Sequence, residues 1–263
     1  MNEIAFIFAG FFVGLVVGLT GVGGGSLMTP LLIFGFGIKP HLAIGTDLLF
    51  AAFTKLGGSV KLARARVIDW RMVGQMAAGS LPASLLTLYV LNQVGATDPA
   101  VQRVMTTTLG VALLLTAAAT LYKALLGKAI AKHIHADDIH AATQPKHWAL
   151  PVLLGAVMGA LVTLTSVGAG ALGVTVLLLL YPALPLPRIV AADIAHAVPL
   201  TLVAGLGHAS LGSVNWPLLA LLLAGSLPGI YVGSHFLLKT PDRVVRSLLS
   251  VLLAYAGAKL IAI

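Results

Sequence analysis

Residues 18–26 read Gly-Leu-Thr-Gly-Val-Gly-Gly-Gly-Ser, a stretch with five glycines at the junction of two apolar runs, residues 4–19 and 26–36. Inside hydrocarbon, backbone that leaves a helix must be buried in protein or line a polar cavity. Glycine allows the turn at positive φ and leaves the backbone amides open to a ligand. The stretch therefore predicts a helix that breaks within a membrane and is followed by a second, short helix.

The composition supports a membrane location, because 59% of the residues are apolar and 9% are charged, too few to cover a water-soluble globule. The apolar runs are continuous and rich in Leu and Ala, whereas strands of a membrane barrel alternate apolar and polar residues. At about 20 residues per crossing, the chain has room for about ten helices and no separate soluble domain. Glu3 occupies the region that is basic in signal peptides, so we expect a retained first helix.

Apolar runs between charges, glycines and prolines predict ten helical segments, five in each half of the chain. The segments are residues 4–19, 26–36, 42–62, 73–94, 101–126, 148–164, 170–181, 189–211, 216–238 and 244–263. The second segment of each half is short. We expect residues 1–127 to form a first transmembrane repeat, residues 128–147 a cytoplasmic loop and residues 148–263 a second transmembrane repeat.

The two halves also share sequence, which indicates an internal duplication. Residues recur 145 or 146 positions later: Thr20, Val22, Gly23 and Gly25 as Thr165, Val167, Gly168 and Gly170, and the motif at 79–82 as residues 225–228. The short segments either cross the membrane, giving ten crossings, or form re-entrant hairpins, giving six crossings and two hairpins. Each half crosses an odd number of times in both versions, so we expect two inverted repeats whose broken helices meet near the midplane.

Lysine and arginine distribute unequally between the two sides of this topology. Twelve fall on one side and three, Lys39, Arg103 and Lys259, on the other. The positive-inside rule places the larger group, and the loop at 127–147, in the cytoplasm, with both termini outside. We therefore expect a multi-pass protein of the cell inner membrane.

The two broken segments predict an anion site. A helix that starts near Ser26 presents unpaired N–H groups and the positive end of its dipole, which suit a small anion. The alternative is that the glycines only allow close helix packing. The candidate substrate-binding residues are Thr20, Gly21, Gly23, Gly24, Gly25, Ser26, Thr46, Lys55, Thr165, Ser166, Gly168 and Gly170.

Asp47, Asp193 and His196 are ionisable residues inside apolar segments, where charges are costly and typically functional. Asp47 lies two turns from Lys55 on a similar helix face, and Asp193 and His196 are close enough to touch. We interpret the three as candidate coupling sites. A buried group that only fixes helix packing is the alternative, and both proton and sodium coupling fit the sequence.

Several other functions find little support. The net charge of +8 comes from basic residues at segment ends without interleaved aromatic residues, so we expect no nucleic-acid partner. Motifs for an intramembrane nucleophile or a zinc protease are absent, so we expect no enzyme and no cofactor. The loop histidines are irregularly spaced, and we expect no metal site there: His133, His135, His140 and His147.

Three motifs in order resemble the sulfite exporter TauE/SafE family: the glycine run 21–25 with Pro30, the step at 43–46 (Ala-Ile-Gly-Thr), and residues 67–71 (Val-Ile-Asp-Trp-Arg). The resemblance covers essentially the whole chain. It implies a membrane permease that exports sulfite, an organosulfonate or another small organosulfur anion.

The sequence thus predicts a secondary transporter that exports a small anion such as sulfite or sulfoacetate by alternating access. A passive anion channel on the same scaffold and a permease for another small oxyanion stay open as alternatives. The expected partners are the anion and the lipid bilayer. A homodimer is compatible with the sequence, which carries no specific signal for one.

Overall fold

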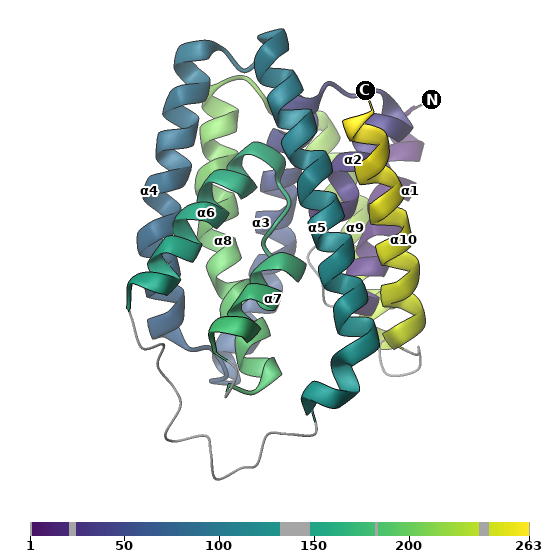
Figure 1. The fold of residues 1–263 in the computed structure, drawn as a ribbon. Coiled ribbons are helices and arrows are strands. Elements are labelled where there is room, and N and C mark those ends of the chain that lie inside the picture. Colours follow the sequence, from purple (N-terminus) through teal and green to yellow (C-terminus); the bar gives the residue numbers. More distant parts are fainter. Residues whose placement is uncertain (1, 21–24, 132–147, 182–183, 237–241, 263) are drawn as a thin grey trace.

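A computed structural model of the chain describes residues 2–20, 25–131, 148–181, 184–236 and 242–262. These residues form ten α-helices and no strand (Figure 1). The helices are α1 (Asn2–Thr20), α2 (Gly25–Phe36), α3 (Pro40–Arg64), α4 (Trp70–Val94), α5 (Pro99–Ala131), α6 (Ala149–Thr165), α7 (Ala171–Leu180), α8 (Leu186–Ser210), α9 (Trp216–Phe236) and α10 (Asp242–Ile261). Each covers one predicted segment, so the all-helical prediction is confirmed.

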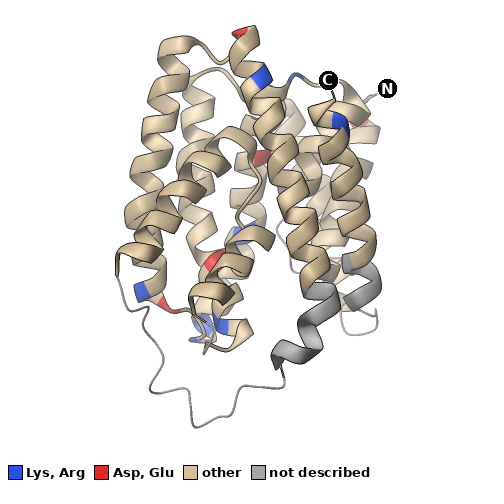
Figure 2. Ribbon diagram, in the orientation of Figure 1, with Lys and Arg blue, Asp and Glu red and all other residues tan. Residues whose placement is uncertain are grey.

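The helices have the surface of a membrane protein. Pro99–Tyr122, Leu186–Ser210 and Trp216–Gly233 are long and apolar enough to cross a membrane by length and composition, and five further apolar helices are shorter. Charged residues gather at the two ends of the bundle, with few between them (Figure 2). Large apolar side chains lie exposed along the bundle instead, among them Leu86, Leu115, Leu153, Leu206 and Leu227.

Each of the two short helices, α2 and α7, runs back toward the end of the bundle at which the preceding helix begins. The rings of Phe6 in α1 and Phe36 in α2 lie 4.7 Å apart between centroids, so α2 ends beside the start of α1. Leu154 in α6 packs against a cluster that contains Leu177 and Tyr181 at the end of α7. With 12 and 10 residues, α2 and α7 span about 18 and 15 Å, roughly half of a bilayer core.

The most extensive helix interfaces all join the first half of the chain to the second: α1 with α9, α4 with α6, α5 with α10 and α3 with α8. Glycines permit the closest approaches. Gly79 of α4 lies against the backbone of Val152 and Ala156 in α6, and Gly225 of α9 lies against the backbone of Ile7 and Phe11 in α1. Gly225 lies 146 positions after Gly79, and Val152 and Ala156 lie 145 positions after Ile7 and Phe11. Equivalent residues of the two halves therefore make equivalent contacts.

Replacing Gly79 with leucine is expected to destabilise the fold by about 3 kcal/mol, because any Cβ at this position collides with the α6 backbone. Gly74→Leu is the matched control, since a Cβ at Gly74 of the same helix meets nothing within 4 Å. Thermal unfolding in detergent measures the difference. Equal melting temperatures for the two variants would show that the α4–α6 approach does not need the glycine.

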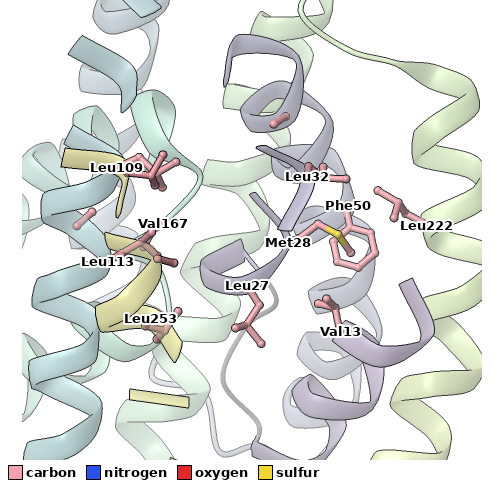
Figure 3. Packing of buried hydrophobic residues seen from close by; sticks show 14 of the residues in the cluster. Val13, Leu27, Met28, Leu32, Phe50, Leu109, Leu113, Val167, Leu222 and Leu253 are labelled. Carbon is pink, nitrogen blue, oxygen red and sulfur yellow. The ribbon is translucent and has the colours of Figure 1, made fainter. Parts of the chain in front are cut away.

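The break between α6 and α7 is held in a defined shape. Ser166 ends α6 in the left-handed region at φ 59°, and Gly168 and Gly170 have φ of 134° and 127°, which glycine adopts without strain. The Val167 side chain between them is buried in the main apolar cluster, where it lies among Leu109 and Leu113 of α5 (Figure 3). Burial of the Val167 side chain therefore fixes the position of the polar backbone of the break.

Candidate functional site

Lys55 of α3 lies buried in the middle of the bundle, which is rare for a lysine. Its Nζ donates a hydrogen bond to the carbonyl oxygen of Ala169, at 3.1 Å, in the break between α6 and α7. The ammonium group is also close enough to Asp47 and Asp193 to interact electrostatically with both carboxylates. Lys55 therefore connects the second break to both buried acids.

Asp47 lies about two helix turns after the start of α3 and is fully buried. Its Oδ2 accepts a hydrogen bond from the hydroxyl of Thr29 in α2. The Ser166 hydroxyl lies beside the same carboxylate but is not placed to form a well-aligned hydrogen bond with it. The other carboxylate oxygen, Asp47 Oδ1, has no hydrogen-bond partner among the described residues. Asp47 thus lies between the short helix of one half and the break of the other.

Asp193 of α8 lies beside α7, the other short helix, as Asp47 lies beside α2. A Cβ on Gly173, in the first turn of α7, would collide with Asp193 Oδ1, so the carboxylate lies directly against that turn. Asp193 is 146 positions after Asp47. Each short helix is therefore in contact with one buried carboxylate, supplied by the long helix that follows it in the chain.

His196 lies one turn after Asp193 and is fully buried. Its Nε2 forms a 2.8 Å hydrogen bond with the hydroxyl of Ser80 in α4, and the ring interacts electrostatically with Lys55. The hydrogen bond of His196 therefore ties α8 to α4, a partner that the local spacing of Asp193 and His196 did not predict.

The charges of this central site do not balance when all are ionised. Asp47 and Asp193 contribute two negative charges and Lys55 one positive charge, which leaves one negative charge in excess. A buried net charge is costly unless it is paired or neutralised. Among the described residues, the central site therefore carries more acidic than basic side chains.

The structure leaves some predicted site residues outside this group. The Thr46 hydroxyl accepts a 3.0 Å hydrogen bond from the backbone N–H of Asn215, so it joins α3 to the start of α9. Thr46 is nine residues before Lys55, about 13 Å along the helix. The Thr165 hydroxyl bonds the backbone oxygen of Leu161 and the N–H of Val167, which stabilises the break itself.

Other candidates lie at or beyond the edge of the first break. Thr20 ends α1, Gly25 begins α2, and Ser26 is buried in the first turn of α2. The remaining glycines of this break, Gly21, Gly23 and Gly24, and the loop histidines lie outside the described residues. The predicted residues that the structure brings together are Asp47, Lys55, Ser166, Asp193 and His196, with the backbone of 168–170.

Sequence reasoning missed three participants: Thr29, Ser80 and Gly173. Thr29 and Gly173 carry no local signal, because their importance comes from carboxylates on the next helix. Ser80 had a signal, since it belongs to the motif 79–82 that recurs in the second half.

Comparison with known proteins gives a consistent result. The family model described as "Sulfite exporter TauE/SafE" matches residues 6–260. The chain is 35% identical to "Probable membrane transporter protein YjnA" of Bacillus subtilis (strain 168), over 98% of this chain and 100% of that protein. It is 28% identical to "Probable membrane transporter protein YdhB" of the same organism, over 95% of this chain and 97% of that protein. No solved structure matches the chain significantly.

The family match extends from α1 to α10. It agrees with the resemblance that the glycine-rich break and the motif at 67–71 indicate. The names of the family and of these relatives indicate a membrane transporter and not an enzyme. The chain belongs to the sulfite exporter TauE/SafE family.

Proposed function

We propose that the chain is a secondary transporter that exports a small anion, sulfite or an organosulfonate such as sulfoacetate, by alternating access. One observation carries the proposal: the buried cation Lys55 is held at the break between α6 and α7, where its charge lies against the non-helical backbone of the break. Backbone N–H groups at a helix start and a nearby ammonium are suited to an oxyanion. The family description names sulfite.

The proposed architecture is two inverted repeats, residues 1–127 and 148–263, joined by the loop 128–147. The reciprocal contacts of α1 with α9 and of α4 with α6 support it, as do the carboxylates against α2 and α7. Since α1–α2 and α6–α7 are hairpins, we favour six crossings and two re-entrant hairpins whose breaks meet near the midplane. Movement of one group of helices against the other would open the site to each side in turn.

In the proposed orientation both termini lie outside the cell inner membrane and the loop 127–147 lies in the cytoplasm. The support is the excess of twelve lysine and arginine residues over three on the opposite side. The central site would then be reached from the cytoplasm through the half of the bundle that contains α7.

Proton coupling follows from the charge of the central site. An anion that enters beside two carboxylates and one ammonium meets an excess of negative charge, so a proton on Asp47 or Asp193 makes its entry more favourable. His196, beside Lys55, is a further candidate. We propose that the anion and a proton occupy the site together, and that export runs down the outward gradient of the anion.

The test is uptake of radiolabelled sulfite into proteoliposomes, with and without a pH gradient, in competition with sulfoacetate, taurine, sulfate and thiosulfate. Saturable uptake supports a transporter, and the order of competition defines the substrate class. Flux that rises linearly with concentration would instead indicate an anion channel. No flux of any of these anions would refute the organosulfur assignment.

Gly173→Ala is expected to lower the initial rate at least about tenfold, because the new methyl group occupies the position of Asp193 Oδ1 and displaces the carboxylate. Gly74→Ala, where a Cβ meets open space, serves as the control and should transport at the rate of the unchanged protein. Equal rates for the two variants would show that the position of Asp193 against α7 is unimportant for transport.

A further inference from the structure

A second group of buried polar side chains lies where α3 begins and α8 ends. This is the end of the bundle that carries both termini (Figure 1). His41 is in the first turn of α3, His208 in the last turn of α8, and Ser213 follows α8; we refer to them as the terminal histidine cluster. A Cβ on Gly45, one turn after His41, would press against His208 Cβ and the Ser213 carbonyl, and the two rings interact electrostatically. The cluster is therefore compact. His208 lies twelve residues after His196, about 18 Å from the central site.

The hydrogen bonds of His208 determine where its proton lies. Its Nε2 is 2.9 Å from the carbonyl oxygen of Thr163. A carbonyl oxygen can only accept, so Nε2 carries the hydrogen and Nδ1 of the neutral ring has a free lone pair. Nδ1 has no hydrogen-bond partner in the described part of the chain, although the side chain is 0% exposed. A buried acceptor without a partner is unfavourable, so this nitrogen gains from bonding to a ligand.

A similar observation applies to His41. His41 lies beside Gln102, whose amide nitrogen donates to the carbonyl of Thr97. His41 Nδ1 has no hydrogen-bond partner among the described residues. The Ser213 hydroxyl is also unpartnered there, and the exposed fractions of His41 and Ser213 are 5% and 1%. Three buried polar atoms in one small region thus lack hydrogen bonds.

Protonation changes what this cluster can bind. In the neutral His208 ring Nδ1 is a lone pair, which repels an oxyanion. A protonated Nδ1 becomes a donor, and the Ser213 hydroxyl adds another. Two adjacent imidazolium groups repel each other, and Lys39 beside His41 adds a further positive charge. An anion between the rings removes that repulsion, while the start of α3 supplies free N–H groups.

We propose that the terminal histidine cluster is a second anion site, which binds a small oxyanion together with a proton at the terminal end of the bundle. The inference rests on the proposed function, since the cluster would receive the anion that the central site carries. The site belongs to one end only, because the positions 146 residues away hold Pro187, Leu62 and Val67, which can neither bind a proton nor donate a side-chain hydrogen bond. The pH on one side of the membrane then controls anion binding.

The test is calorimetric binding of methanesulfonate, whose charge is constant between pH 6 and 8, to purified Lys55→Gln protein. This background weakens the central site. We expect binding at pH 6 to be about tenfold tighter than at pH 8, with proton uptake revealed by buffers of different ionisation enthalpy. The double variant His41→Gln and His208→Gln should lose the pH dependence, while the amide at position 208 can still donate to the Thr163 carbonyl. His235→Gln, at the end of α9, is the histidine control and should bind as the background does.

Ser213→Ala tests the cluster with less risk to folding, and we expect about threefold weaker binding at pH 6 with proton uptake retained. Two results would overturn the site: no binding by the Lys55→Gln protein at pH 6, or binding that the histidine variants leave unchanged. Binding that depends on the histidines, in a protein whose proteoliposomes carry no sulfite or sulfonate, would support the site and refute the proposed transport function.

Discussion

Replacing Lys55 with glutamine is expected to lower the initial rate of sulfite uptake by about 100-fold or more. The change removes the positive charge that interacts with both Asp47 and Asp193. Unit charges about 4 Å apart interact by about 4 kcal/mol at an effective dielectric constant of 20, and about 3 kcal/mol is a 100-fold change in occupancy. Uptake into proteoliposomes over the first seconds measures the effect.

Two further variants make this result interpretable. Arg103→Gln removes an exposed positive charge at the end of the bundle and should transport normally. Lys55→Arg keeps the charge but not the compact ammonium geometry, so we expect a partial rate. If Lys55→Gln transports at the unchanged rate while folding normally, the anion does not bind at Lys55 and the proposed site is wrong.

Asp47→Asn and Asp193→Asn are expected to separate anion movement from proton movement. An asparagine resembles a protonated aspartate, so the anion still enters but the residue at which a proton binds is lost. In the unchanged protein, lowering the pH protonates a carboxylate and increases anion binding, so uptake rises as pH falls. With one proton per monovalent anion, a gradient of one pH unit supports about tenfold accumulation. Whichever of the two aspartates carries the coupling proton, its asparagine variant should exchange labelled for unlabelled anion but should not accumulate the anion.

The measurement compares counterflow with gradient-driven uptake between pH 5.5 and 8, and the coupling variant should show a flat pH profile. Asp98→Asn is the control, because Asp98 caps the start of α5 and asparagine caps a helix equally well. If both aspartate variants still accumulate anion along a pH gradient, proton coupling through these residues is wrong, and the same assay with a sodium gradient identifies the other coupling ion.

The sequence predicted the elements of this protein better than their partners. All ten segments are helices, because continuous apolar runs and glycine or proline breaks are local signals. Local spacing also identified Asp47, Lys55, Asp193 and His196 as buried ionisable residues, and the structure places them together. It did not identify Thr29 or Gly173, because contacts between helices depend on how the helices rotate and approach, which no single segment encodes. Thr46 illustrates the same limit, since its hydroxyl bonds the start of α9 rather than facing Lys55.

The packing of α1 against α9 has a consequence for how the protein is made. The glycine contacts of α1 are with a helix that begins at Trp216, 196 residues after α1 ends at Thr20. At about 10 residues per second, the ribosome needs about 20 s to synthesise that distance. During this interval α1 lies in the bilayer without the helix it packs on, and its small-residue face is open to other helices or to the membrane insertion machinery. Folding of this protein is therefore completed only near the end of translation, when α9 enters the membrane and occupies that face.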